Sequence, residues 1–170
     1  MECTLCPRKC NIDRSVSKGF CGETDAVRIS RAALHFYEEP SISGKEGSGA
    51  VFFAGCNLKC VFCQNIDISR GNAGKEVSIE RLSDIFIELQ SQGANNINLV
   101  TPSHYVLQIK EALIAAKDKG LSIPIVYNSS AYELPETLKI LDGLVDVYLP
   151  DFKYMDDTMA VNFSNAPSYY

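Results

Sequence analysis

Apolar and polar positions from residue 50 onward fall into blocks that have the lengths of strands and helices. Short apolar runs such as "AVFFA" at 50–54 are typical of strands buried on both faces. Longer segments with apolar residues three or four positions apart are typical of amphipathic helices. This pattern predicts strands at 50–54, 97–101, 123–127 and 145–152, and helices at 78–93, 103–120 and 134–143.

The alternation of strands and helices predicts an α/β fold with βαβ units and a parallel sheet. In the first helix, Ser78 is the expected N-cap and Gly93 the expected stop. Functional residues of such folds gather where the parallel strands end. We expect one rim to carry the polar positions that follow the four strands, namely a cysteine loop, Thr101, Asn128 and Asp151.

Residues 1–48 show no comparable periodicity. They are rich in Cys, Arg, Ser and Gly, and "EEPSISGKEGSGA" at 38–50 has the composition of a loop. We therefore divide the chain into a Cys-rich N-terminal extension, residues 1–48, and a core domain, residues 49–170.

The placement of the seven cysteines indicates metal ligation. Their number is odd, and disulfides are disfavoured in the cytosol, so a disulfide framework is a poor explanation. Instead they form two local groups, C-x2-C-x3-C-x10-C and C-x3-C-x2-C, and the second follows the first predicted strand directly. The first group is Cys3, Cys6, Cys10 and Cys21, and the second is Cys56, Cys60 and Cys63.

The two groups differ in how many ligands they offer. Four thiols can close a structural zinc site or hold an iron–sulfur cluster, and spacing does not separate these alternatives. Three thiols leave a ligand missing. His104 could complete a zinc site, or a [4Fe-4S] cluster could keep one iron open for a substrate or cofactor.

Charge and hydropathy exclude some classes of partner. The net charge is -5, which gives no electrostatic support for sequence-independent binding to nucleic acid. No apolar stretch has the length of a transmembrane helix, and "MECTLCPRKC" lacks the apolar core of a signal peptide. We expect a cytoplasmic protein without a nucleic-acid or membrane partner.

The motif "CNLKCVFC", placed after the first strand, resembles that of the radical S-adenosylmethionine (SAM) superfamily. Together with "CPRKC" and "HFYEEPSISG", it resembles the pyruvate formate-lyase activating enzyme-related branch. The resemblance implies a [4Fe-4S] cluster on Cys56, Cys60 and Cys63, with SAM on the fourth iron. The reduced cluster would cleave SAM to methionine and a 5′-deoxyadenosyl radical, which would abstract a hydrogen atom from a substrate.

The resemblance also implies cofactor-binding residues on the rim. Phe62 would lie against the adenine of SAM. "DFK" resembles the D-x-K motif of activating enzymes, with Asp151 at its start and Lys153 pairing with the SAM carboxylate.

Two further rim segments depart from the family pattern or admit a simpler explanation. "TPSHY" stands where the superfamily commonly has a Gly-Gly-Glu type segment, and Thr101 or Ser103 would meet the SAM amino group there. Asn128 would face the ribose, although Asn also favours turns for local reasons.

The expected architecture is a partial (β/α) barrel of radical SAM type, truncated after about four strands, with an open edge at the last strand. The implied partners are an electron donor of the flavodoxin or ferredoxin type and a glycyl-radical enzyme or other protein substrate. The alternative is a non-catalytic zinc- or iron–sulfur-binding remnant of such an enzyme. No catalytic side chain can be named from the sequence.

Overall fold

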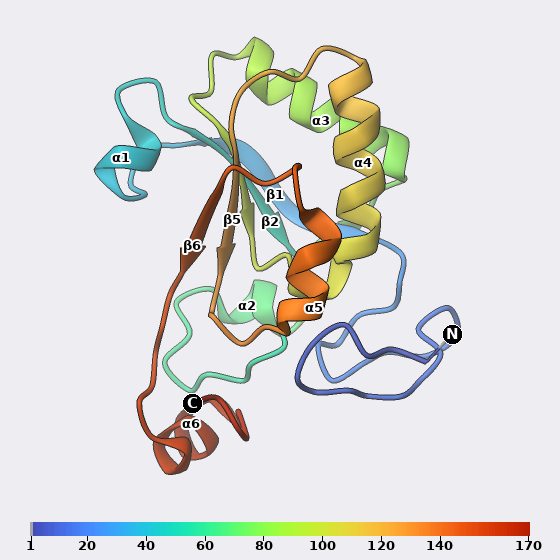
Figure 1. Ribbon diagram of the computed structural model, residues 1–170, viewed down its shortest axis with the longest axis vertical. Helices are drawn as coiled ribbons and strands as arrows, with labels where there is room; N and C mark the ends of the chain where they lie inside the picture. The colour runs from blue at the N-terminus through green and yellow to red at the C-terminus, as the bar shows by residue number, and fades with distance from the viewer. Residues whose placement is uncertain (1) are drawn as a thin grey trace.

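The computed structural model describes residues 2–170, which form a mixed α/β fold around a six-stranded sheet (Figure 1). The strand order is β3-β1-β2-β4-β5-β6. The strands are β1 (Arg28–His35), β2 (Ser48–Phe53), β3 (Lys75–Glu76), β4 (Ile97–Val100), β5 (Ile125–Ser129) and β6 (Val147–Pro150). The helices are α1 (Pro40–Ser43), α2 (Ile66–Ser69), α3 (Ile79–Ser91), α4 (Val106–Asp118), α5 (Pro135–Leu138) and α6 (Asp157–Ser164), with 3-10 turns η1 (Ser103–Tyr105) and η2 (Lys139–Leu141).

The parallel part of the sheet follows the predicted order. Strands β2, β4, β5 and β6 are parallel neighbours, and in register Val51 lies beside Leu99, which lies beside Tyr127. The observed bounds differ from the predicted ones by at most two residues at each strand end. Among the described strands β6 pairs only with β5, so it forms the edge of the sheet.

Strand β1 lies within the segment that the sequence assigns to the N-terminal extension, and no strand was expected there. It runs antiparallel to β2 and to the two-residue β3. A shift of register between Ile29 and Arg31 marks a β-bulge, which breaks the two-residue periodicity by which a strand is recognised. The sheet therefore recruits residues from both parts of the chain.

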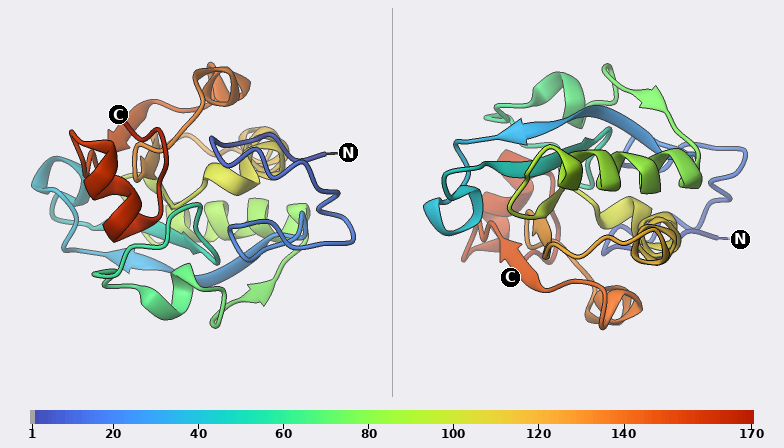
Figure 2. Two further views of the ribbon diagram at one scale, coloured as in Figure 1. Left: turned by 90° about the horizontal axis from the view of Figure 1, so that it is seen from below. Right: turned by 90° about the horizontal axis from the view of Figure 1, so that it is seen from above.

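Helices α3 and α4 lie on one face of the sheet (Figures 1 and 2). The side chain of Ser78 caps α3 by accepting from the Arg81 N–H at 3.1 Å, and Gly93 follows the helix with φ 88°, as predicted. The second and third predicted helices each include a 3-10 turn, η1 and η2. The short helices α1 and α2 and the C-terminal α6 were not expected.

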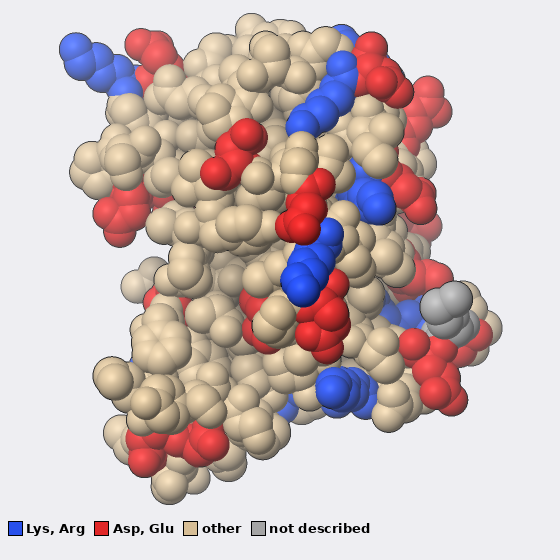
Figure 3. All heavy atoms as spheres, viewed as in Figure 1, with Lys and Arg blue, Asp and Glu red and all other residues tan. Residues whose placement is uncertain are grey.

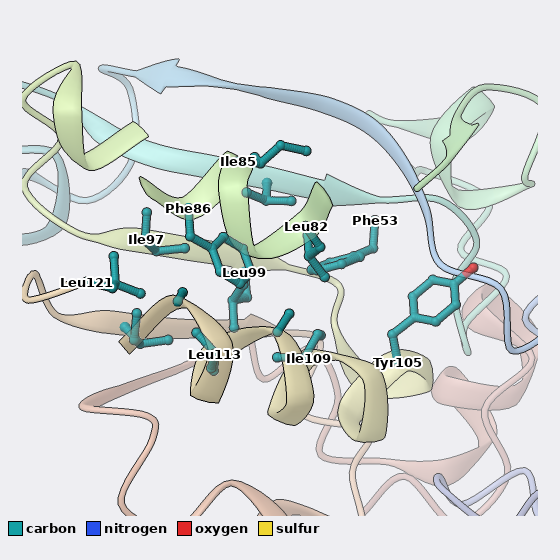
Figure 4. Packing of buried hydrophobic residues seen from close by; sticks show 14 of the residues in the cluster. Phe53, Leu82, Ile85, Phe86, Ile97, Leu99, Tyr105, Ile109, Leu113 and Leu121 are labelled. Atoms are coloured by element: carbon teal, nitrogen blue, oxygen red, sulfur yellow. The ribbon is translucent and has the colours of Figure 1, made fainter. Parts of the chain in front are cut away.

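The main core lies between this helix pair and the sheet (Figure 4). Leu82 and Phe86 of α3 and Leu113 of α4 pack toward Ile97 and Leu99 of β4, and all five are fully buried. This packing fixes the strands from one side. The carboxyl ends of the parallel strands point to the lower end of the molecule in Figure 1, where the chemistry-bearing loops lie.

One face of the molecule shows how its charged side chains are distributed. On the face in Figure 3, Lys and Arg side chains lie singly among Asp and Glu. Within the described part of the chain, no helix is long and apolar enough to cross a membrane.

Candidate functional site

The loop that bears Cys56, Cys60 and Cys63 runs from the end of β2 to α2, at the lower end of the molecule (Figure 1). All three thiols are free and partly exposed. The loop opens with Gly55 at φ 82°, a conformation that L side chains rarely adopt. The thiols thus stand on the rim that the strand pattern predicts.

Each thiol of this loop has a polar neighbour. The Leu58 N–H donates to Cys56 Sγ at 3.4 Å, and the Ser164 hydroxyl donates to Cys60 Sγ at 2.8 Å. Cys63 Sγ lies 3.4 Å from the Ser69 hydroxyl. Burial raises the pKa of Cys56 to about 11, so this thiol becomes a thiolate at neutral pH only beside a cation.

The C-terminal segment packs directly under the cysteine loop (Figure 2, left). Backbone N–H groups of Lys59 and Val61 donate to the carbonyls of Ser164 and Phe163, both at 2.9 Å. A second apolar cluster lies beside Cys56 and Cys60 and consists of Leu58, Tyr132, Ala160, Ala166 and Tyr169. The loop is therefore held by α6 and the residues after it.

The D-x-K segment reaches the same place from the end of β6. The Lys153 ammonium forms an ion pair with the Asp151 carboxylate, and the Lys153 backbone N–H donates to the Tyr169 hydroxyl at 2.8 Å. Burial lowers the pKa of Lys153. The hydrogen bond to Asp151, the charge of Asp151 and the nearby Cys60 raise that pKa by more, so it lies above its usual value. Lys153 is thus a positive charge within electrostatic reach of Cys60.

The other residues predicted to bind SAM differ in exposure and in hydrogen bonding. Phe62 is half exposed beside Cys63. Thr101 has a positive φ of 59°, and its backbone N–H donates to the Asn128 carbonyl at 2.9 Å. The Ser103 side chain is buried, and its hydroxyl donates to the Glu133 carboxylate in the loop that follows β5.

Sequence reasoning missed Glu38, which comes from the segment between β1 and α1. Its carboxylate accepts from the amide of Asn98 at 2.9 Å and from that of Asn128 at 3.3 Å, so it joins β4 to β5 across one face of the sheet. Asn98 is fully buried and its Oδ1 has no hydrogen-bond partner among the described residues. An Asn inside the apolar strand "INLV" was the signal available in the sequence.

Glu133 was also missed. It lies at a cavity of about 200 Å³ between β5, β6 and α5, where Tyr127 donates to its carboxylate at 3.2 Å. Burial raises the pKa of Glu133 from 4.5 to about 7, against the lowering effect of hydrogen bonds from Ser103, Ser129 and Tyr127. No single residue pattern in "AYELPE" identifies this acid, because tertiary packing creates its environment.

Glu133→Gln is expected to change how stability depends on pH. The folded-state pKa lies above the unfolded value, so the folded state binds the extra proton and wild-type stability falls as pH rises from about 4.5 to about 7. The neutral amide removes this loss. The stability of the variant relative to wild type should therefore be about 3 kcal/mol higher at pH 8 than at pH 4.5, as measured by urea unfolding at both pH values. An identical wild-type–variant difference at both pH values would contradict the assignment, and Glu136→Gln on the exposed side of α5 is the matched control.

His104 does not join the cysteines. Its Nε2 lies 2.7 Å from the Ala54 carbonyl, and burial lowers the pKa of His104 to about 3, so the ring is neutral. Across residues 2–170, no three His, Cys, Asp or Glu side chains are already gathered closely enough to hold a metal ion. The zinc alternative for the three-cysteine loop, which needs His104, therefore gains no support from this geometry.

Comparison with known proteins places the chain in a family and finds a relative that is similar over nearly its whole length. The family model of the Radical SAM superfamily matches residues 50–168, which include the cysteine loop and the D-x-K segment. The chain is 33% identical over 178 residues to "Uncharacterized protein MJ0674" of Methanocaldococcus jannaschii. That alignment covers 99% of the chain and 50% of the relative, so the chain spans about half the length of the curated relative it matches.

Proposed function

We infer that the chain, which belongs to the radical SAM superfamily, acts as an activating enzyme that takes a hydrogen atom from a protein substrate. Membership of the superfamily implies SAM-dependent radical chemistry with an iron–sulfur cluster. A [4Fe-4S] cluster held by Cys56, Cys60 and Cys63 would supply the electron for reductive cleavage of SAM, the reaction from which hydrogen abstraction would follow.

The residues of the loop fit such a cluster. Free, partly exposed thiols are the ligands that iron–sulfur clusters use, and three of them leave one iron for SAM. Each cysteine binds a different iron atom of a cubane, so the thiols need not converge on one point as they would around a single ion. In this assignment Cys56, Cys60 and Cys63 hold the cluster, and their hydrogen-bonding neighbours orient them.

The protein's other contributions are binding, orientation and exclusion of water. Lys153 would pair with the SAM carboxylate, since it is the positive charge that the C-terminal segment brings to Cys60. Phe62 would pack on the adenine, and the backbone around Thr101 would meet the amino group. Asn128, bonded to Glu38, would face the ribose. The observation that carries this proposal is the convergence of the cysteine loop and the D-x-K segment on one rim.

The finer assignment to the pyruvate formate-lyase activating enzyme-related branch rests on the sequence motifs. The proposed glycyl-radical partner and the flavodoxin- or ferredoxin-type electron donor rest on the same motifs. The four parallel strands are proposed as the first strands of a partial (β/α) barrel. The open edge of β6 fits this proposal, because its backbone groups would pair with a further strand.

A direct test follows SAM cleavage and the origin of the abstracted hydrogen. The iron-reconstituted protein is incubated anaerobically with reductant, SAM and proteins from its native cells labelled with α-deuterated glycine. The proposal predicts 5′-deoxyadenosine that carries deuterium. Unlabelled 5′-deoxyadenosine would contradict a glycyl-radical role, whereas colourless protein with stoichiometric zinc and no SAM cleavage would favour the non-catalytic remnant.

A further inference from the structure

The proposed reaction uses no residue before Glu38, yet the structure organises the four N-terminal cysteines. A short hairpin carries the first three: the Cys3 N–H donates to the Ile12 carbonyl at 2.8 Å, and the Asn11 N–H donates to the Cys3 carbonyl at 3.0 Å. Within it, the Lys9 N–H donates to the Cys6 carbonyl at 3.0 Å, closing a turn with a positive φ at Lys9. These hydrogen bonds fix the backbone that carries Cys3, Cys6 and Cys10.

A second turn presents the fourth cysteine to the first three. The Gly22 N–H donates to the Gly19 carbonyl at 2.9 Å, and the Gly19 N–H donates to the Glu23 carbonyl at 3.0 Å. A Cβ at Gly19 would lie 3.3 Å from Cys21 Sγ and 3.8 Å from Cys10 Sγ, so the bare glycine lets these two sulfurs approach the same place.

The four thiols are close enough to act on one another. Cys3, Cys10 and Cys21 all contribute to the electrostatic environment of Cys6. The Phe20 N–H donates to Cys10 Sγ at 3.4 Å, and backbone hydrogen bonds at Arg8 and Glu23 act on Cys6 and Cys21. Cys6 and Cys21 are both buried, and the Cys21 thiol makes only a long contact, donating to the Glu23 carbonyl at 3.8 Å.

Positive side chains surround the group. The Arg8 guanidinium lies 3.7 Å from the centre of the Phe20 ring, and Lys59 lies 5.4 Å from the same ring. Arg14 is buried and acts electrostatically on Cys21. These cations offset the negative charge that four thiolates around a metal would carry.

We propose that Cys3, Cys6, Cys10 and Cys21 form a second metal site, closed by four thiolates, that fixes the position of the cluster-binding loop. The occupant is a thiophilic metal centre. A zinc ion and an iron–sulfur cluster share this ligand chemistry, and metal analysis separates them. The thiols do not yet enclose an ion, so binding selects the cysteine rotamers that converge.

The link to the loop is made of direct contacts. The Cys56 N–H donates to the Cys21 carbonyl at 3.2 Å, which joins the last cysteine of one group to the first of the other. The Arg8 Nε donates to the Asn57 carbonyl at 2.8 Å. A Cβ on Gly55 would come within 2.7 Å of the Cys21 carbonyl oxygen, so the two segments are in close contact. The positioning role rests on the proposed function of Cys56, Cys60 and Cys63, but the metal site itself does not.

The site is tested in the full chain with the first cysteine group intact and the loop ligands removed. The variant C56S/C60S/C63S is purified anaerobically, and its zinc and iron are counted. We expect one metal centre per chain, and X-ray absorption at the metal edge should show four sulfur ligands at about 2.3 Å for zinc. A zinc edge identifies the ion, and an iron edge with iron–iron scattering identifies a cluster. A chain without stoichiometric metal, or with mixed oxygen and nitrogen ligands, would overturn the proposal.

The converse variant tests the positioning role. C6S/C21S should lose the second metal, and its loop should bind the [4Fe-4S] cluster about 10- to 100-fold more weakly, the range typical of residues that orient metal ligands. Ser17→Ala, on the same segment, is the matched control and should keep both centres. An unchanged cluster affinity in C6S/C21S would overturn the positioning role. Because C6S/C21S could fail to fold, chelation of the second metal from intact wild-type protein provides the same comparison.

Discussion

Replacing Cys60 with serine is expected to abolish SAM cleavage. Serine preserves the size of the side chain but supplies no thiolate, so one iron of the cluster loses its ligand. The loss of 5′-deoxyadenosine formation should exceed about 100-fold, because residues that merely orient metal ligands already cost 10- to 100-fold. The measurement is the yield of 5′-deoxyadenosine per chain under anaerobic reduction, alongside the iron content after reconstitution.

Val61→Ala is the matched control for this prediction. Val61 lies next to Cys60, its side chain is two-thirds exposed, and it offers no ligand. The control should retain iron and cleave SAM at close to the wild-type rate. If C60S kept wild-type iron content and cleavage, Cys60 would not be a cluster ligand.

Replacing Lys153 with methionine is expected to weaken SAM binding without removing the cluster. Methionine keeps an unbranched apolar stem but removes the ammonium group that would meet the SAM carboxylate. A charge-assisted hydrogen bond is worth about 1.5 to 3 kcal/mol, so the Kd for SAM should rise about 10- to 100-fold. The Kd is read from the change in the cluster spectrum as SAM is added.

Lys110→Met separates this effect from a general loss of positive charge. Lys110 is exposed on α4, outside the D-x-K segment, and its replacement should leave the Kd unchanged. Equal weakening in both variants would show that the effect is not local to the rim. A drop in the iron content of K153M would instead assign Lys153 a role in holding the cysteine loop.

Sequence patterns predicted β2, β4 and β5 because these parallel strands are buried, whereas β6 at the edge is mostly exposed. The continuous apolar run "AVFFA" reflects a strand that is buried in the sheet. The 3.6-residue period from Ile79 to Leu89 reflects a helix that packs one face in the same core. Strand β1 escaped detection because a bulge interrupts its alternation, and β3 is too short to produce a pattern. Helix α6 is capped by Asp156 and ends at Asn165, which has a left-handed conformation. These end signals were present in the sequence, but the apolar periodicity between them is too weak to indicate a helix.

The site was predictable where chemistry dictates spacing and unpredictable where packing creates it. The cysteine spacing and the D-x-K segment were visible in the sequence, because few residue types can perform those tasks. The environments of Glu38 and Glu133 depend on contacts between distant segments. Glu38 accepts from Asn98, and Glu133 accepts from Ser103 and Tyr127. The hydrogen bond from Ser103 to Glu133 could not be predicted either, because it joins the segment after β4 to the loop after β5.

The central claim is that the three-cysteine loop holds a cluster with one iron open to SAM. Electron paramagnetic resonance of the reduced, iron-reconstituted wild-type protein before and after SAM addition tests it most directly, with C56S/C60S/C63S as the control that shows which signal comes from the loop. The account predicts a [4Fe-4S]⁺ signal whose line shape changes when SAM binds. A cluster signal that SAM leaves unchanged, or no cluster on this loop, would contradict it.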